Sequence, residues 1–124
     1  MNQMRIAVPT EGTGGMDAPR SAHFGHAPTF TIVDVSEGAI VSAEPLANPP
    51  HSHGGCGMTV AMLADAGVTT AIVVGMGGGP MNAMRSHGMT ALHDDRSPTP
   101  RTAVEAYLSG SLKPFGDDNT CRGH

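Results

Sequence analysis

A short apolar run in the middle of the chain, TAIVVG at residues 70–75, constrains the fold more than any other segment. A continuous run of this kind is typical of a central strand in a parallel sheet, which is buried on both faces. Helical periodicity precedes it, from Met58 to a stop at Gly67, and returns after it at residues 81–87, with Pro80 at the first helical position. A strand that lies between two helices along the chain indicates an α/β domain.

Strands are also predicted before this unit. MRIAVP at residues 4–9 has the composition of a buried strand, and residues 29–35 and 39–45 are expected to form a hairpin around a turn at residues 37–38. No helix separates these three strands along the chain. This part of the sheet is therefore predicted to be an antiparallel meander.

The C-terminal third continues the alternation. Residues 89–93 are predicted to form a brief strand, and residues 100–108 a helix with Thr99 as its N-cap. The order β-β-β-α-β-α-β-α predicts a single α/β domain, in which the antiparallel meander and parallel βαβα units share one mixed sheet flanked by helices. We expect this domain to span residues 1–113, followed by a polar tail that bears Cys and His at residues 114–124.

Length and charge exclude several classes of protein. The 124 residues suffice for one hydrophobic core but not for two. The net charge is −4 and Lys113 is the only lysine, which argues against nucleic acid or an anionic membrane as a partner. Because no apolar run approaches the ~20 residues that span a bilayer, and the first residues lack the apolar stretch of a signal peptide, we expect a cytoplasmic protein.

The segment HSHGGCGM at residues 51–58 carries the strongest chemical signal. His51, His53 and Cys56 lie within six residues on a glycine-rich loop that opens a helix, and imidazole with thiolate is the ligand set that soft and borderline metals select. The alternative is a solvated loop whose cysteine is inert, and the spacing matches no zinc-finger pattern. Cys121 and His124 add two donors near the end of the chain, and in a reducing cytosol the two cysteines are interpreted as thiols rather than as a disulfide.

A second loop, MGGGP, follows the central strand. Successive glycines expose backbone N–H groups, and the next helix presents its N-terminus, so the loop can cradle an anion. It lacks the Lys-Ser pair of a P-loop. Both loops are expected beyond the carboxyl ends of the strands, where ligands gather in open α/β sheets. Arg20 and Arg85 are interpreted as surface arginines that can add positive charge there. The predicted loop contacts are Met76, Gly77, Gly78 and Gly79.

The element order, SAHFGHAPTF near the start, the His/Gly loop before the first helix and ADAGVTTAIVVGMGGGPMNAMRSHGM together resemble the dinitrogenase iron-molybdenum cofactor biosynthesis family. The resemblance covers about residues 4–112 and implies a ribonuclease H-like fold. It also implies an accessory protein that carries or holds cofactor precursors without chemistry of its own. One branch of the family, the orange protein, holds a molybdenum and copper sulfide cluster. By resemblance, the histidine of the H-F-G motif, His23, contacts the cofactor.

A ribonuclease H-like fold does not by itself imply nuclease activity. That reaction needs several carboxylates at strand ends to hold two magnesium ions. The first predicted strand has none, and Asp34 and Glu44 are interpreted as isolated acids on a half-exposed sheet.

The leading hypothesis is a monomeric, non-catalytic carrier or scaffold for a metal–sulfur cluster that contains molybdenum with iron or copper. It is expected to pass the cluster on, with a cluster-donating or cluster-accepting protein as its partner. One alternative is a mononuclear zinc or copper binding or regulatory module, held by the His/Cys loop with Cys121 and His124. Another is a small hydrolase or transferase, against which stands the absence of a Ser-His-acid, paired-carboxylate or P-loop motif.

Overall fold

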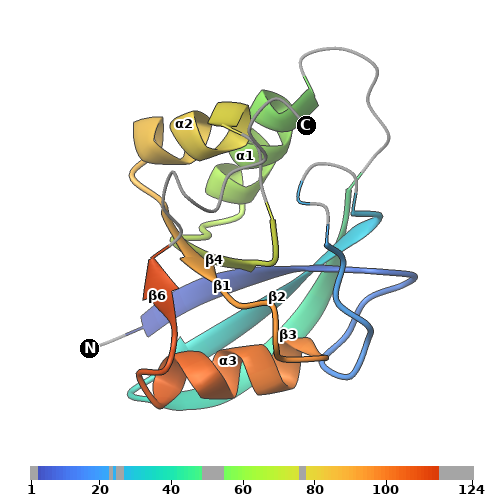
Figure 1. Cartoon of the computed structure of the whole chain (residues 1–124), viewed down its shortest axis with the longest axis vertical. Coiled ribbons are helices and arrows are strands. Elements are labelled where there is room, and N and C mark those ends of the chain that lie inside the picture. The colour runs from blue at the N-terminus through green and yellow to red at the C-terminus, as the bar shows by residue number, and fades with distance from the viewer. Residues whose placement is uncertain (1–2, 23, 25–26, 49–54, 76–77, 115–124) are drawn as a thin grey trace.

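A mixed sheet separates two layers of helix (Figure 1). The computed structural model describes residues 3–22, 24, 27–48, 55–75 and 78–114, with the side chains of 55–58 and 78–80 outside that description. In these residues the elements are β1 Gln3–Thr10, β2 Thr29–Ser36, β3 Ala39–Ala47, α1 Gly55–Asp65, β4 Thr70–Val73, α2 Gly78–Ser86, β5 Thr90–His93, α3 Pro100–Leu108 and β6 Lys113–Pro114. None of these helices is long and apolar enough to cross a membrane.

The strand order in the described sheet is β3-β2-β1-β4-β5-β6. β1, β2 and β3 pair antiparallel, whereas β1, β4 and β5 pair parallel, as the element order predicted. α1 and α2 cover one face of the sheet and α3 covers the other (Figure 1). The predicted α/β class with a mixed sheet is confirmed.

β2 shows why the sheet has two cores. Phe30 and Ile32 point to the face under α1 and α2, while Val33 and Val35 point to the face under α3, and all four are buried. Phe24 joins the first core by packing edge-to-face on Phe30, with ring centroids 5.3 Å apart. β2 is therefore buried on both faces. The expectation that this hairpin forms a half-exposed sheet is wrong for β2.

The residues around the start of α3 predicted the position of this helix correctly. Thr99 Oγ1 accepts from the backbone N–H of Thr102 at 3.2 Å, and the Thr102 hydroxyl accepts from the backbone N–H of Thr99 at 3.1 Å. This reciprocal capping satisfies two donors that the first turn would otherwise leave unpaired. α3 begins at Pro100 and ends at Leu108, as predicted.

The starts of two helices and one short strand differ from the prediction. α1 begins at Gly55, three residues before Met58, where helical periodicity was predicted to start. α2 begins at Gly78, two residues before Pro80, because a proline fits anywhere in a first turn where no N–H is needed. β6 was not predicted, since two residues that include a proline give no strand signal; it pairs antiparallel with Leu92 and His93 of β5. Residues 115–124 lie outside the described residues.

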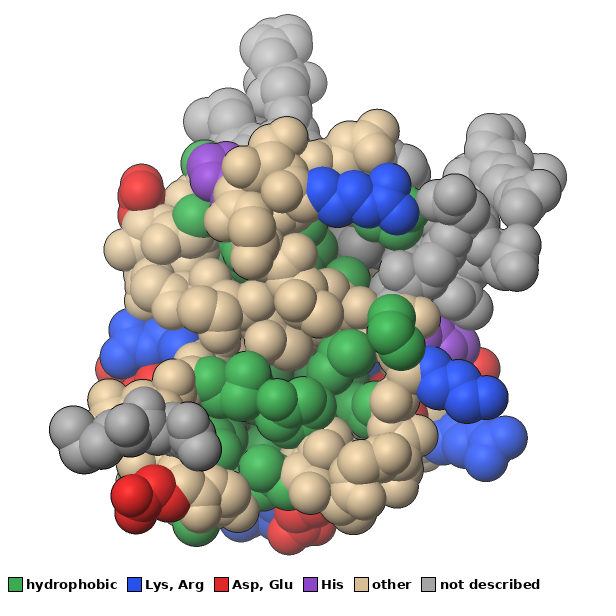
Figure 2. All heavy atoms as spheres, turned by 90° about the vertical axis from the view of Figure 1, so that its left-hand side faces the viewer, with side chains coloured by type: hydrophobic (Ala, Val, Ile, Leu, Met, Phe, Trp, Pro, Cys, Tyr) green, Lys and Arg blue, Asp and Glu red, His purple; other side chains and the backbone are tan. Residues whose placement is uncertain are grey.

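The left-hand side of Figure 1 faces the viewer in Figure 2. Apolar side chains gather there in the lower half, and charged side chains of both signs are scattered around them. The core under α3 has half-buried residues at its margin, among them Met4, Tyr107, Leu108 and Leu112. Met81 and Met84, by contrast, are buried in the core on the other face.

Candidate functional site

The carboxyl ends of β1, β4 and β5 lie at one edge of the sheet, which we call the carboxyl edge. α1 leads into β4, so its N-terminus at Gly55 lies at this edge, and α2 leaves β4 and begins there at Gly78 (Figure 1). The first N–H groups of a helix have no partner within the helix and carry a partial positive charge. Two helix N-termini therefore direct positive potential toward the same edge.

Two predicted ligand segments leave the sheet from neighbouring points at this edge. Asn48 Nδ2 donates to the carbonyl of Ala27 at 2.6 Å, and the Asn48 backbone N–H donates to the carbonyl of Pro28 at 3.0 Å. The segment that contains His23 ends beside Ala27, and the loop that contains His51 begins just after Asn48. The described ends of both segments are thus held beside each other.

The structure places few of the predicted ligands themselves. Cys56 lies in the first turn of α1, and Gly78 and Gly79 open α2, so the predicted loop-to-helix junctions are present. The other predicted contacts lie outside the described residues: His23, His51, His53, Met76, Gly77, Cys121 and His124. Convergence of these donors on one metal centre stays a prediction.

Within the described part of the chain, no group of three or more His, Cys, Asp or Glu side chains could hold a metal ion. The loops that carry most of the predicted donors lie outside these residues. β6 runs from beside His93 to beside Leu92, away from the carboxyl edge.

A buried ion pair that the sequence did not reveal lies at the carboxyl edge. Arg20 Nη1 is 3.5 Å from Asp94 Oδ2, and each side chain is only 4% exposed. Arg20 lies in the loop after β1, and its backbone forms a bridge with Thr10, whereas Asp94 directly follows β5. The interpretation of Arg20 as a surface residue is wrong, because the loop folds back over the strand ends and encloses the side chain.

Backbone groups hold both members of this pair. Arg20 donates from Nη1 to the carbonyl of Ser97 at 3.1 Å and from Nη2 to the carbonyl of Ile72 at 3.4 Å. Asp94 Oδ1 accepts the backbone N–H groups of Arg96 at 2.9 Å and Ser97 at 3.2 Å. The pair therefore ties the loop after β1 to the ends of β4 and β5.

Two atoms of the pair remain unsatisfied. Arg20 Nε and Asp94 Oδ2 are buried without a hydrogen-bond partner among the described residues. Burial lowers the pKa of Arg20, opposed by the charges of Asp94 and Asp95. Burial raises the pKa of Asp94, but hydrogen bonds from Ser97 and Arg96 and the charge of Arg20 outweigh it, so the net shift is downward. The Asp94 carboxylate is therefore ionised at neutral pH, and the guanidinium of Arg20 keeps its proton, as arginines do in proteins.

Arg85 does not belong to this edge. It is exposed, as expected, but it lies in the last turn of α2, at the end opposite to Gly78. A helix of this length separates its two ends by roughly 10 Å. Of the two arginines considered from the sequence, Arg20 is thus the one at the carboxyl edge, and an Asp directly after a strand is the signal that could have indicated its partner.

A mixed sheet of this order with helices on both faces defines an α/β domain of the ribonuclease H-like class. The sequence profile described as dinitrogenase iron-molybdenum cofactor matches residues 4–110, and the chain belongs to this family. Among curated proteins, no match is found.

Solved structures share the fold. The apo form of the orange protein from Desulfovibrio gigas is 29% identical with a TM-score of 0.80, over 90% of this chain and 92% of that chain. A candidate NifB protein from Thermotoga is 24% identical with a TM-score of 0.75, over 90% and 93% of the two chains. A candidate dinitrogenase from Methanocaldococcus jannaschii is 15% identical with a TM-score of 0.69, over 92% and 96%. The last two show the fold alone.

Proposed function

We propose that the protein is a non-catalytic carrier that binds a metal–sulfur cluster or cofactor precursor at the carboxyl edge and passes it to another protein. The observation that carries this proposal is membership of the dinitrogenase iron-molybdenum cofactor family over residues 4–110. The likeness to the orange protein, at 29% identity over most of both chains, supports it. The expected cargo contains molybdenum with iron or copper.

The charge at the carboxyl edge supports an anionic cargo. Thiometallate clusters are anions, and a negative charge near a helix N-terminus is stabilised by roughly 0.3 to 1 kcal/mol at an exposed site. The N-termini of α1 and α2 both lie at this edge. His23, His51, His53 and Cys56 are the soft donors proposed to contact the metals, with the amides of the glycine loop around the sulfides.

The acidic residues do not support a nuclease. A two-metal reaction needs several carboxylates that share metal ions at strand ends. β1 contains no acidic residue, and Asp94 is committed to Arg20 and to the backbone of the following turn. A binding role without hydrolysis fits these residues better.

The test is anaerobic loading with tetrathiomolybdate and copper(I) or iron(II), read by bound metal per chain and by the charge-transfer absorption of the cluster. We expect His53→Ala and Cys56→Ala each to lower the bound metal, because they remove soft donors from the loop. His87→Ala is the matched control, since His87 is exposed beyond the far end of α2. Unchanged metal content in both loop variants would contradict the proposed donors.

Truncation separates this proposal from a mononuclear zinc or copper site closed by the tail. Deletion of the residues after Gly116 removes Cys121 and His124. A carrier of a preformed cluster is expected to keep its affinity within about tenfold, or ~1.4 kcal/mol, because the sulfides already satisfy the metals. Loss of all cluster binding, with circular dichroism unchanged, would favour the tail-closed site.

A further inference from the structure

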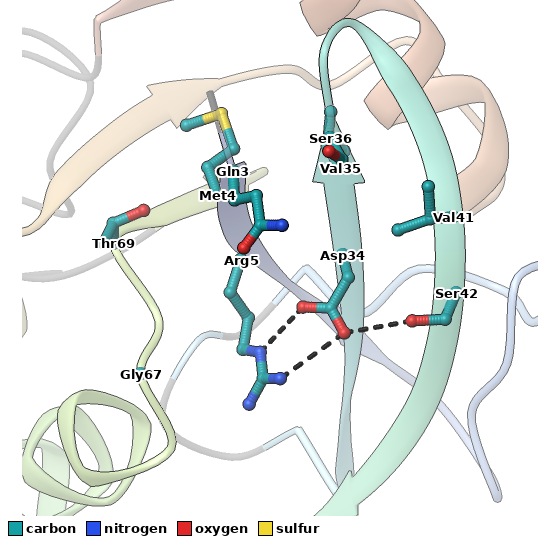
Figure 3. Close-up of a pocket in the computed structure, with 10 residues that line it drawn as sticks. All are labelled: Gln3, Met4, Arg5, Asp34, Val35, Ser36, Val41, Ser42, Gly67 and Thr69. Atoms are coloured by element: carbon teal, nitrogen blue, oxygen red, sulfur yellow. Dashed lines mark hydrogen bonds and ion pairs between the residues drawn. The ribbon is translucent and has the colours of Figure 1, made fainter. Parts of the chain in front are cut away.

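A pocket of about 420 Å³ lies at the amino ends of β1 and β4, at the end of the sheet opposite to the carboxyl edge. We call it the amino-edge pocket. β1, β2 and β3 provide its floor, and the turn between α1 and β4 provides one wall (Figure 3). Its lining includes Arg5, Asp34, Val41, Ser42 and Thr69.

An ion pair lies in the floor of this pocket. Arg5 Nε donates to Asp34 Oδ1 at 2.7 Å, and Nη2 donates to Oδ2 at 3.4 Å (Figure 3). Ser42 Oγ also donates to Asp34 Oδ2, at 3.0 Å, and Arg5 Nη1 donates to the carbonyl of Ala66 at 2.7 Å. The expectation that Asp34 is an isolated acid is therefore wrong, because β1 places Arg5 directly opposite it.

Both charges of this pair remain accessible. The Arg5 side chain is 38% exposed and the Asp34 side chain is 29% exposed. The hydrogen bond to Asp34 raises the pKa of Arg5, and the hydrogen bond from Arg5 lowers the pKa of Asp34, so both stay ionised at neutral pH. A guanidinium has five N–H groups, of which three donate to the acceptors named above. The floor therefore presents a fixed dipole with donor capacity left for a ligand.

A β-bulge adds an apolar surface to the pocket. Asp34 pairs with Ser42 and Val35 pairs with Ile40, which leaves Val41 as the extra residue of β3. In a regular strand Val41 and Ser42 would point to opposite faces, but both point toward Asp34 here (Figure 3). Val41 is 62% exposed, the one large hydrophobic side chain exposed to this degree among the described residues.

We propose that the amino-edge pocket binds a small aliphatic α-amino acid in its zwitterionic form. The ammonium group meets Asp34, the carboxylate meets the remaining N–H groups of Arg5 and the Thr69 hydroxyl, and the aliphatic side chain lies against the exposed Val41. A zwitterion can meet each accessible member of the ion pair with the opposite charge, whereas a singly charged ion can meet only one of them. The volume falls within the usual range of small-molecule sites, roughly 300 to 1,000 Å³.

The test is a titration of the full chain with valine, followed by backbone amide NMR. We expect saturable shifts at Arg5, Ser42 and Thr69 with a dissociation constant on the order of 1 mM. Valinamide keeps only the ammonium and N-acetylvaline keeps only the carboxylate, so each is expected to bind at least about tenfold more weakly. Equal binding of either analogue, or no saturable shift with valine up to about 10 mM, overturns the proposal.

Variants test which side chains of the pocket contact the ligand. Asp34→Asn keeps the shape but removes the charge, and it is expected to weaken valine binding about tenfold or more, or ~1.4 kcal/mol. Asp17→Asn is the matched control, because it removes the carboxylate of another Arg–Asp pair, Arg101–Asp17, that lies outside the pocket. Unchanged valine affinity in Asp34→Asn overturns the proposal.

Val41→Thr is expected to weaken binding of valine but not of glycine, and this exposed substitution tests the pocket even if Asp34→Asn fails to fold. Equal losses for both amino acids would contradict the apolar contact. The proposal does not depend on the carrier function. Asp34→Asn is expected to load clusters normally, so failure of one proposal is distinguishable from failure of the other.

Discussion

Arg20–Asp94 and Arg5–Asp34 join the same two chemical groups at opposite ends of one sheet, yet they are built differently. In the pair at the carboxyl edge both side chains are 4% exposed, the closest charged atoms are 3.5 Å apart, and the backbone supplies the hydrogen bonds. In the pair at the amino edge the side chains are 38% and 29% exposed and bond directly at 2.7 Å.

The difference teaches what each pair contributes. Charges removed from water carry a large desolvation cost, so the buried pair is held in place by many fixed dipoles and loses much when one member is removed. A half-exposed pair contributes little to stability because water and salt screen it, but its charges stay available to a ligand. Burial therefore decides which pair is structural and which can serve as a binding surface.

The largest effect is predicted for Arg20→Met. The substitution leaves Asp94 as a buried charge without its partner, and breaking a buried pair in this way costs about 3 to 5 kcal/mol. Urea unfolding of the variant and the parent measures the difference in free energy of unfolding. The double variant Arg20→Met with Asp94→Asn is expected to recover part of the loss, and a loss below about 1 kcal/mol in the single variant would contradict the structural role.

The second largest effect is predicted for acidification, which protonates the carboxylate of Asp94 in the buried pair. The pKa of Asp94 is lower in the folded protein than its ordinary value. Its stabilising contribution is therefore present above about pH 4 and is lost as the pH falls through the folded pKa. The free energy of unfolding should fall with acidification, and the fall should be shallower in Asp94→Asn. Identical pH dependence in the two proteins would contradict a lowered pKa of Asp94 in the folded state.

A smaller effect is expected for Arg5→Met. The half-exposed ion pair contributes little after screening, but the hydrogen bond from Arg5 Nη1 to the carbonyl of Ala66 at the end of α1 is also lost. Together these changes should cost about 1 kcal/mol in the free energy of unfolding. A cost equal to that of Arg20→Met would remove the distinction between the two pairs.

The smallest effect is expected for Asp17→Asn, which breaks the most exposed pair. Arg101 and Asp17 are 48% and 76% exposed, although their atoms approach to 3.0 Å. Because solvent screens such a pair almost fully, the urea midpoint should not move. A clear shift of the midpoint would mean that distance, rather than burial, ranks the three pairs.

Elements with their own local signals could be predicted from the sequence. α3 follows from Thr99 and Pro100, and β4 follows from its apolar run, because these signals act within a few residues. β6 and the burial of Arg20 depend on chain segments that meet only in the folded protein. Nothing in the residues beside Arg20 indicates that Asp94, 74 positions later in the printed sequence, supplies its counter-charge.

The candidate site also has some features that the sequence predicted and others that it did not. The sequence predicted that the His/Cys loop and the glycine loop both open helices, and α1 and α2 begin where such loops end. The hydrogen bonds of Asn48 were not predicted, because its partners Ala27 and Pro28 belong to another connection. Candidate ligands could be inferred from residue type alone. The contacts that hold the chain beside them could be identified only from the folded structure.

The bulge at Val41 has a consequence for the behaviour of the protein at high concentration. β3 is an edge strand of the sheet, and the unpaired backbone groups of an edge strand can pair with a strand of another molecule. A bulge distorts that outer row, and Pro45, farther along β3, lacks an N–H to contribute to it. The same irregularity that turns Val41 into the amino-edge pocket thus makes β3 a poor template for edge-to-edge aggregation.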